Sequence, residues 1–232
     1  MEQHILEDYV KQIHALTEKG GRASSTALAA ALGVAAPAVS KALPRLAAMG
    51  LIQHDPYRGA ELTDTGRLMA VEVIRHHRLV EMFLNQALGM SWDEVHAEAE
   101  RLEHVVSEAM EARMDAFLGF PAVDPHGHPI PTADLYLPTC QLPRLSDSQP
   151  GDAVILRRVD DRDDAVLRHL ERAGLVPGAA LHVVEVSPME GIVRLSVGGG
   201  DRTLAIKIAD QVYVEAAEAT GAALHGEGTH AG

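Results

Sequence analysis

The sequence predicts a mainly α-helical chain that ends in a small β domain. Apolar residues recur at three- and four-residue steps through most of residues 2–118, which is the period of an amphipathic helix. A proline-rich stretch, 121–145, then interrupts the helical pattern. From residue 147 onward, short runs of β-branched and aliphatic residues alternate with glycine turns, as in a small barrel. We therefore expect helical domains followed by a linker and a β domain.

Residues 1–64 have the pattern of a winged helix-turn-helix. An amphipathic helix over 2–19 ends at two glycines, and a short helix over 26–32 follows two serines that can cap it. A glycine turn then leads to a third helix over 36–49. Short extended runs on either side of a turn-rich segment, 54–59, predict the hairpin called the wing.

The helix over 36–49 would be the recognition helix of such a fold. Its basic residues, Lys41 and Arg45, can reach phosphates or guanine edges, and the apolar residues at its start can contact a thymine methyl group. Pro44 lies inside this helix, where it removes one backbone hydrogen bond and can kink the chain. The residues predicted to contact DNA, the last of them in the wing, are Pro37, Ala38, Ser40, Lys41, Arg45 and Arg58.

Charge is distributed unevenly along the chain. The 232 residues carry a formal net charge of −13, yet residues 1–75 hold eight Lys/Arg and eight Asp/Glu. Residues 76–232 hold twelve Lys/Arg against twenty-five Asp/Glu. A neutral N-terminal region can bind DNA if its basic side chains gather on one surface, so the overall acidity does not exclude DNA as a partner.

The composition excludes several classes of protein. The sequence has no run of eighteen apolar residues, and its N-terminus is charged almost at once, so we expect a cytoplasmic protein with no membrane partner. A single cysteine, Cys140, excludes an internal disulfide framework and a cysteine-based zinc cluster. Any metal ion must therefore be held by His, Asp and Glu.

The segment from Ser91 to His104 has His and carboxylate side chains at metal-ligand spacing. A helix is predicted to start at Ser91, because Glu94 follows three residues later and completes a capping box. On that helix Glu100, Glu103 and His104 stand at positions i, i+3 and i+4, within reach of one ion. An ordinary solvated helix also carries Glu and His, and this alternative stays open on the segment alone.

The helix predicted over 65–88 carries a second polar pair. His77 and Glu81 are four residues apart and so share one face of that helix, and His96 begins another polar stripe on the helix that follows. The broad apolar faces of this region, including segment 105–118, lack enough partners within it. This shortage predicts a dimer interface.

Three segments of the chain resemble one known family. RHHRLVEMFL at 75–84, WDEVHAEAERLEHVVSE at 92–108 and DPHGHPIP at 124–131 are similar, in this order, to the metal-dependent repressors of the diphtheria toxin repressor family, the DtxR/MntR regulators. The resemblance covers residues 1 to about 215. It implies a winged helix over 1–64, a helical dimerisation and metal-binding domain over 65–140, a linker over 141–146 and an SH3-like barrel of the FeoA type over 147–216. The remaining residues, 217–232, are rich in Gly, Ala and His, and this composition predicts a disordered tail.

The resemblance also implies a primary metal site made of Asp8, Glu100, Glu103 and His104. In the iron-responsive branch the positions of Asp8 and Glu100 typically hold methionine and cysteine, whereas here both are carboxylates, as in the manganese-responsive branch. Oxygen-rich ligands with one imidazole favour Mn²⁺ over softer metals. We therefore expect Mn²⁺ as the cofactor, with Fe²⁺ as the alternative.

For a second site, the resemblance leaves two ligand sets open. The set of the toxin repressor itself would be His77, Glu81 and His96 with Asp160 or Asp161 from the barrel. The set of some three-domain manganese regulators would be Glu81, Asp124 and His126 with an aspartate from the barrel.

Two positions depart from the patterns of these relatives. Arg158 stands where the toxin repressor has a barrel glutamate, and a guanidinium cannot coordinate a cation. Lys11 stands where the two-domain manganese regulators have a glutamate, so their paired-metal arrangement is not expected here.

Together these observations predict a manganese-activated transcriptional repressor that binds a palindromic DNA operator as a homodimer and controls metal uptake. Without metal, Asp8, Glu100 and Glu103 would repel one another and leave the first helix loosely placed. The alternatives are an iron-responsive regulator of the same family, a metal-dependent hydrolase and a metal buffer. An enzyme is not expected, because we find no separate nucleophile or base motif and assign no catalytic residue.

Overall fold

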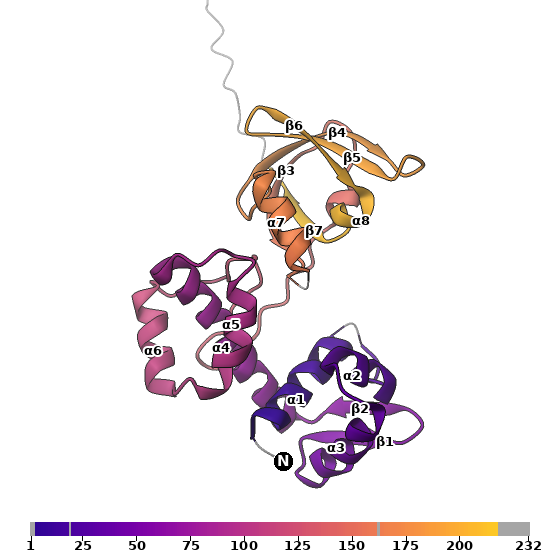
Figure 1. Ribbon diagram of the computed structural model, residues 1–232, viewed down its shortest axis with the longest axis vertical. Helices are drawn as coiled ribbons and strands as arrows, with labels where there is room; N and C mark the ends of the chain where they lie inside the picture. The colour runs from indigo at the N-terminus through magenta and orange to yellow at the C-terminus, as the bar shows by residue number, and fades with distance from the viewer. Residues whose placement is uncertain (1–2, 19, 162, 218–232) are drawn as a thin grey trace, which may run out of the picture. The chain divides into compact units, whose positions relative to one another are not determined.

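The computed structural model describes residues 3–18, 20–161 and 163–217, and the chain forms two compact units. Unit 1 comprises Met1–Gln141 and Asp160–Arg168, and unit 2 comprises Leu142–Val159 and His169–Gly232. Within unit 1 helices dominate, whereas unit 2 is built on a sheet (Figure 1). The prediction of a mainly α-helical protein with a C-terminal β domain is confirmed. The predicted disordered tail lies, apart from Ala217, outside the described residues.

The first five elements form a winged helix with its own core. Ser24 caps α2 by accepting a hydrogen bond from the Ala27 N–H, and Gly33 ends this helix in the left-handed conformation at φ 63°. The two strands of the wing pair antiparallel, with Ile52 opposite Leu62. The elements are α1 (Gln3–Thr17), α2 (Ser25–Leu32), α3 (Ala36–Ala48), β1 (Ile52–Asp55) and β2 (Gly59–Leu62).

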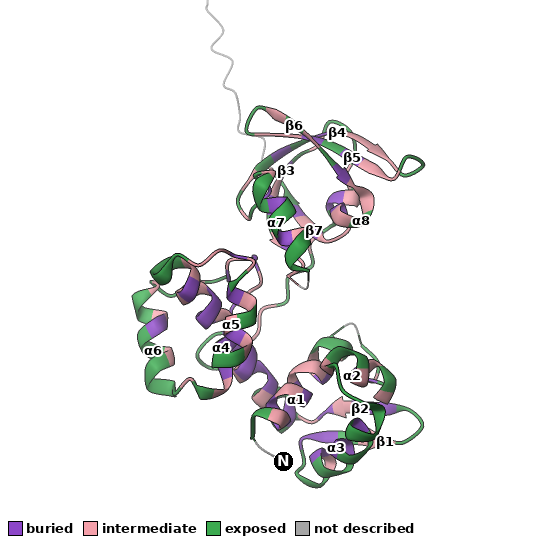
Figure 2. Cartoon of the chain, in the orientation of Figure 1, coloured by how far each residue is buried: buried purple, intermediate pink, exposed green. Residues whose placement is uncertain are grey.

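Helix α3 continues through Pro44 without ending there. Proline has no N–H to donate to the Ser40 carbonyl, and both residues lie on the exposed face of α3, where water can hydrate that carbonyl (Figure 2). The opposite face buries Val39, Leu43 and Leu46 in the winged-helix core. Among the described residues, no single helix is long and apolar enough to span a membrane, and only α2 and α3, bent by 111°, meet both criteria as a pair.

Helix α4 (Asp64–Leu88) leads from the winged helix to the remaining helices of unit 1. Its N-cap, Thr63, accepts a hydrogen bond from the Gly66 N–H. A Cβ atom at Gly66 would lie 2.0 Å from the Leu51 carbonyl oxygen, so only glycine allows α4 to pack this closely against the chain before the wing. Gly89, with φ 69°, ends the helix as predicted.

The helix predicted to begin at Ser91 begins later, so that prediction was wrong. The Ser91 hydroxyl does donate to Glu94 Oε2 at 2.6 Å, but this contact closes a turn, and α5 spans Val95–Leu102. A short 3₁₀ turn, Glu103–Val105, follows directly. Helix α6 (Glu108–Phe117) then begins after the N-cap Ser107.

A second apolar core joins these helices, and ion pairs between α4 and α6 reinforce it. The core is formed by Val80, Leu84, Val95, Ala99 and Met114. Arg75 donates to Glu111 Oε1 and Asp115 Oδ2 of α6, at 2.5 and 2.6 Å. These contacts fix α4, the element that carries several of the predicted ligands.

The chain after α6 folds back on unit 1 before it leaves. Within 121–145, Asp124, His126 and Ile130 are buried, and the Arg75 guanidinium donates to the Pro131 carbonyl at 2.5 Å. An isolated bridge pairs Val123 with Pro129. The first part of the proline-rich stretch is therefore packed structure.

Unit 2 contains a five-stranded antiparallel sheet in the order β6-β5-β4-β3-β7. Alternate residues of β4 and β5 are buried, as a sheet with one covered face requires. After β6, residues Ile206–Ala209 form the single helical turn α8. The strands are β3 (Ala153–Val159), β4 (Ala180–Ser187), β5 (Ile192–Val197), β6 (Gly200–Ala205) and β7 (Val212–Ala216), with η2 (Leu145–Asp147) before them and α7 (Asp164–Arg172) after β3.

Candidate metal centres and nucleic-acid interface

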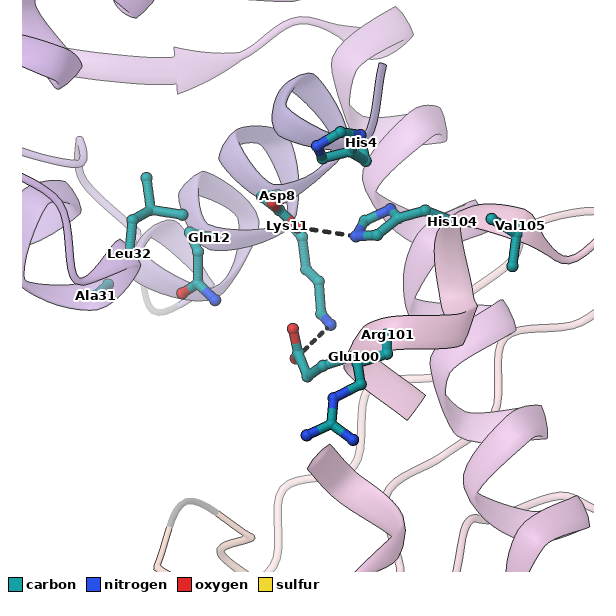
Figure 3. Close-up of a pocket in the computed structure, with 10 residues that line it drawn as sticks. All are labelled: His4, Asp8, Lys11, Gln12, Ala31, Leu32, Glu100, Arg101, His104 and Val105. Carbon is teal, nitrogen blue, oxygen red and sulfur yellow. Dashed lines mark hydrogen bonds and ion pairs between the residues drawn. The ribbon is translucent and has the colours of Figure 1, made fainter. Parts of the chain in front are cut away.

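A first cluster of ligand-type side chains lies where α1 meets the 3₁₀ turn after α5. Asp8, Glu103 and His104 each offer a ligand atom, and these atoms all lie within 4.8 Å of one another. His104 Nε2 is 3.0 Å from Asp8 Oδ1 and 3.5 Å from Glu103 Oε1. Figure 3 shows the contact between Asp8 and His104, with Glu100 farther along the pocket, next to the end of the Lys11 side chain. We call Asp8, Glu100, Glu103 and His104 the first cluster.

A buried glutamate orients His104. The Nδ1 atom of His104 lies 2.7 Å from Glu7 Oε2, and Glu7 is 8% exposed. In a neutral ring that donates its Nδ1–H to a carboxylate, Nε2 carries the lone pair that can bind a metal ion. In His104 this atom points toward Asp8 and Glu103. Glu7 was not predicted from the sequence, although its position next to Asp8 on α1 could have indicated a role in this site.

Lys11 supplies a positive charge inside the first cluster. Its Nζ atom lies 2.8 Å from Glu100 Oε1 (Figure 3). The same atom lies 2.9 and 2.7 Å from the two oxygens of Glu103, which is fully buried. The same ammonium lies 3.3 Å from His77 Nδ1. The expectation that Asp8, Glu100 and Glu103 repel one another without compensation is therefore wrong, because Lys11 neutralises part of their charge.

The pKa values in this cluster follow from burial and from Lys11. Burial alone would lower the pKa of the Lys11 ammonium, but Glu103 and Glu100 outweigh it and raise that pKa. Burial would raise the pKa of Glu100, and Lys11 reverses this effect and lowers it. The pKa of Asp8, which Lys11 does not contact, is raised by burial, and the charges of Glu103 and Glu100 add to that rise.

Glu100 lies apart from the group that surrounds Asp8. Its carboxylate groups instead with His77 and His96, and its Oε1 is 3.9 Å from a nitrogen of each. The cause is local: α5 ends at Leu102, so the 3₁₀ turn carries Glu103 and His104 away from the helical face that holds Glu100. Lys11 joins the two parts of the first cluster.

A second cluster surrounds Glu81, which is fully buried on α4. Glu81 Oε1 lies 3.0 Å from His77 Nε2 and 3.1 Å from His96 Nδ1. Its other oxygen, Oε2, faces His126 Nδ1 at 3.7 Å, which is too far for a hydrogen bond. We call Glu81, His96, Asp124, His126, His128 and Asp161 the second cluster.

Hydrogen bonds outside the cluster fix which atoms face into it. Asp124 Oδ1 accepts from the backbone N–H groups of His126 and His128, at 2.8 and 2.9 Å, which leaves Oδ2 for the cluster. His126 Nε2 lies 2.7 Å from the Trp92 carbonyl, to which it can donate, so Nδ1 is the atom presented to Glu81. The Trp92 ring stacks on the His126 imidazole at an interplanar angle of 22°.

The segment after β3 contributes Asp161 to this cluster. Asp161 belongs to unit 1, and one of its oxygens lies within 4.8 Å of a carboxylate oxygen of Glu81 and a ring nitrogen of His96. Asp160 is in none of the ligand groups formed by the described residues. Arg158 lies with its guanidinium carbon 4.2 Å from the centre of the Tyr213 ring, a cation–π contact, which gives it a role unrelated to metal.

Four buried atoms of the second cluster have no hydrogen-bond partner among the described residues: Glu81 Oε2, Asp124 Oδ2, His126 Nδ1 and His128 Nδ1. Buried polar atoms are rarely left in this state, because an unmade hydrogen bond costs about 1–3 kcal/mol. Carboxylate oxygens and imidazole nitrogens that converge in this way are the donor set of a divalent cation. The residues present therefore fit such an ion.

Two histidines near Glu81 have raised pKa values. Burial lowers the pKa of His77 and of His126, but the charge of Glu81 outweighs this effect and raises each to about 9. Protons therefore take the place of an ion beside Glu81 in the metal-free chain.

The predicted DNA contacts all lie on exposed residues of the winged helix. The exposed face of α3 carries Pro37, Ala38, Ser40, Lys41 and Arg45. Arg58 is exposed in the turn between β1 and β2, where Asp55 Oδ1 accepts from the N–H groups of Tyr57 and Arg58, at 2.8 and 3.1 Å. Tyr57, which the sequence analysis missed, is 98% exposed at this tip, and an aromatic residue in a turn was its signal.

Three family descriptions match successive parts of the chain. "Iron dependent repressor, N-terminal DNA binding domain" matches residues 3–60, and "Iron dependent repressor, metal binding and dimerisation domain" matches residues 63–132. "FeoA domain" matches residues 144–216.

Individual relatives include both iron- and manganese-dependent proteins. The iron-dependent repressor IdeR of Mycobacterium leprae is 35% identical over 221 residues, which cover 90% of this chain and 96% of IdeR. The transcriptional regulator MntR of Salmonella typhimurium is 42% identical over 118 residues, which cover 51% of this chain and 73% of MntR. A solved structure described as a manganese-dependent transcriptional repressor complex with manganese is 37% identical, with a TM-score of 0.84 over 91% of this chain and 100% of that one.

Proposed function

Because this chain belongs to the diphtheria toxin repressor (DtxR) family of metal-dependent transcriptional repressors, we propose that Mn²⁺ activates it to repress transcription as a homodimer. The family consists of transcriptional repressors and not of enzymes, which excludes the hydrolase alternative. Its domains bind DNA, bind metal and dimerise. Since relatives of both metal types exist, the choice of Mn²⁺ rests on the side chains of this chain.

The donor atoms of the first cluster carry the manganese proposal. Asp8, Glu100 and Glu103 offer carboxylate oxygens, and His104 offers one imidazole nitrogen. Such hard oxygen donors suit Mn²⁺, whereas a thiolate or a thioether would draw softer, later metals. Cys140 is exposed and belongs to neither cluster.

Asp8 couples the first cluster to the DNA-binding region through α1. The same helix buries Leu6, Val10 and Ile13 in the core that it shares with α3. Any shift of Asp8 toward Glu103 and His104 therefore moves the helix on which the winged-helix core is built. A bound divalent ion would supply the positive charge that allows the three carboxylates to lie close together.

Lys11 already makes some of the contacts between α1 and the other ligand residues, so a bound ion has fewer contacts left to form. Because its ammonium already bonds Glu100 and Glu103, α1 is tied to α5 and to the 3₁₀ turn in the metal-free chain. Asp8 and His104 are the ligand groups that Lys11 does not contact. We infer that these two residues, rather than the repulsion of all three carboxylates, determine whether α1 takes its DNA-binding position.

The proposed partner is a palindromic operator. A symmetric dimer presents two copies of α3, and each can enter the major groove of one half-site. Repression by a metal-bound form switches genes off when the ion is abundant. We therefore expect genes of manganese uptake as targets and a place of action inside the cell, where the DNA is.

The test is a selection of DNA fragments bound by the full-length protein with and without Mn²⁺. The affinity for the selected fragment is then measured against free Mn²⁺ and free Fe²⁺ under anaerobic conditions. We expect one palindromic sequence that is enriched only with metal. We also expect Mn²⁺ to activate DNA binding at a lower free concentration than Fe²⁺ does. Equal DNA affinity in a chelator would refute the proposal, and the absence of any selected DNA with or without metal would favour a metal buffer.

The variant Glu100→Cys tests the choice of metal. A thiolate at this position should lower activation by Mn²⁺ relative to Fe²⁺ or Co²⁺, by about tenfold, without abolishing DNA binding. The measurement is DNA affinity against the free concentration of each ion. An unchanged order of activating metals would remove the main physical support for manganese.

A further inference from the structure

The turn 124–128 brings to the second cluster a side chain that neither expected ligand set includes. His128 Nδ1 lies 3.4 Å from Asp124 Oδ2 and 3.7 Å from Asp161 Oδ2. The ligand atoms of Asp124, His126 and His128 all lie within 4.8 Å of one another. His128 is therefore as close to this group as the residues that the family resemblance suggests.

The backbone holds His128 in this position. The Asp124 N–H donates to the His128 carbonyl, and the His128 N–H donates to Asp124 Oδ1, both at 2.9 Å. Gly127 makes the turn between them possible with φ 90°, a conformation that other residues rarely adopt. These hydrogen bonds thus fix the backbone of His128, and its imidazole lies beside Asp124 Oδ2.

The unpaired atoms point to a ligand. His128 Nδ1 is buried without a hydrogen bond among the described residues, and its side chain is only 17% exposed. Three further atoms are buried without a hydrogen bond among the described residues, in side chains that are at most 1% exposed: His126 Nδ1, Asp124 Oδ2 and Glu81 Oε2. A cation bound by Asp124, His126 and His128, whose ligand atoms lie within 4.8 Å of one another, would satisfy three of these atoms, and Glu81 Oε2 lies 3.7 Å from His126 Nδ1.

We propose that His128 binds a divalent ion through Nδ1, together with Glu81, Asp124, His126 and Asp161. This inference rests on the proposed metal-dependent function and adds one ligand to it. Three carboxylates carry more charge than the ion, and Arg78, with Nε 3.7 Å from Asp124 Oδ2, balances part of the excess. A neutral imidazole adds a coordination bond without adding to the repulsion among the carboxylates.

His128 also changes the expected selectivity of the second cluster. With His126 it places two converging imidazoles beside Asp124, whereas His104 alone faces Asp8 and Glu103 in the first cluster. Imidazole nitrogen suits iron and the later metals better than carboxylate oxygen does. We therefore expect the second cluster to discriminate less between Mn²⁺ and Fe²⁺ or Co²⁺ than the first.

The test is a titration of the full-length, metal-free protein with Mn²⁺ under anaerobic conditions. Electron paramagnetic resonance counts the free ion, and pulsed measurements report nitrogen bound to the protein-held ion. The variants are His128→Phe, which keeps a ring but loses the nitrogen, and His126→Phe as the comparison. His182→Phe, at an exposed position of β4, is the matched control. Circular dichroism of the metal-free variants verifies their folding.

The expected result is two Mn²⁺ ions per wild-type chain, with the second bound at least about tenfold more weakly in His128→Phe and in His126→Phe. In His128→Asn the amide oxygen can replace Nδ1, so affinity should return in part while one nitrogen signal is lost. This variant carries the test if His128→Phe does not fold.

Two outcomes would overturn the inference. Weakening by His126→Phe alone, with the nitrogen signal of His128→Asn unchanged, would show that His128 is not a ligand, and the proposed function would stand. A single ion whose affinity neither variant changes would show that the second cluster holds no metal. Failure of the proposed function is recognised separately, because DNA binding would then ignore Mn²⁺ even where the titration shows uptake.

Discussion

The first and second clusters solve the same electrostatic problem in different ways. In the first, the Lys11 ammonium bonds two of the three carboxylates, so the metal-free chain already holds a positive charge there. In the second, four buried donor atoms remain without hydrogen bonds among the described residues. Part of the negative charge of the first cluster is thus balanced without metal, whereas the second cluster depends on an ion or on protons.

This difference separates two consequences of metal binding. An ion in the second cluster satisfies buried atoms and so should mainly stabilise the fold of unit 1. An ion in the first cluster must compete with Lys11, and it gains Asp8 and His104, which Lys11 does not contact. The first cluster should therefore mainly switch the position of α1.

The largest effect is expected from Glu81→Ala, which removes the central carboxylate of the second cluster. We expect Mn²⁺ affinity at this cluster to fall by at least about 100-fold, and most of the rise in melting temperature that Mn²⁺ produces to disappear. Thermal unfolding with and without Mn²⁺ measures this. Glu190→Ala, at an exposed turn, is the control. If Glu81→Ala is stabilised by Mn²⁺ as strongly as the wild type, the contrast between the clusters is wrong.

A smaller effect in the opposite direction is expected from Lys11→Met. Removing the ammonium leaves Glu100 and Glu103 without their cation, so the metal-free protein should lose about 2 kcal/mol of unfolding free energy. The first cluster should bind Mn²⁺ about tenfold more tightly, because the ion no longer competes with Lys11. Urea unfolding and Mn²⁺ titration measure the two changes.

Lys207→Met, at an exposed position of α8, is the matched control for that variant. Weaker Mn²⁺ binding in Lys11→Met would mean that Lys11 supports the ion instead of competing with it.

The last effect is a pH dependence of the metal-free protein. The pKa values of His77 and His126, raised to about 9 because Glu81 outweighs burial, exceed the value of about 6.5 in an unfolded chain. Their protonation therefore stabilises the fold fully below pH 6.5, and this contribution declines as the pH rises through about 9. The slope is at most about 1.4 kcal/mol per pH unit for each group.

Urea unfolding of the metal-free protein at several pH values between 6.5 and 9 measures this decline. His126→Phe should show a shallower slope than the wild type. A slope that is the same in both would indicate that the proton on His126 does not contribute.

The local features of the fold could be predicted from the sequence, because periodicity and caps act over a few residues. Ser24, Gly33 and Gly89 mark helix ends where they were expected. Ser91 and Glu94 misled the prediction, since the same hydrogen bond that caps a helix can also close a turn before one.

From spacing alone, the candidate site was predictable only where its residues share one element, whereas the grouping of Asp8 with Glu103 and His104 came from the family resemblance. His77 and Glu81 were paired by their spacing on α4, and the structure keeps them 3.0 Å apart. For Lys11 the sequence showed only that it stands where some relatives have a glutamate. Its contacts with Glu100 and Glu103 could not be predicted, because about ninety positions of sequence separate these residues. His128 was quoted within its motif but given no role, because only the fold brings it near Asp161.

The central claim is that metal switches DNA binding through Asp8 and supports the fold through the second cluster. The most direct test measures affinity for the selected operator against free Mn²⁺ in the wild type, Asp8→Asn and His126→Asn, with bound Mn²⁺ counted in the same samples. We expect Asp8→Asn to lose the metal response while it still binds the ion of the second cluster. His126→Asn should keep the response and require at most a moderately higher Mn²⁺ concentration. A metal response that survives in Asp8→Asn and vanishes in His126→Asn would contradict this assignment.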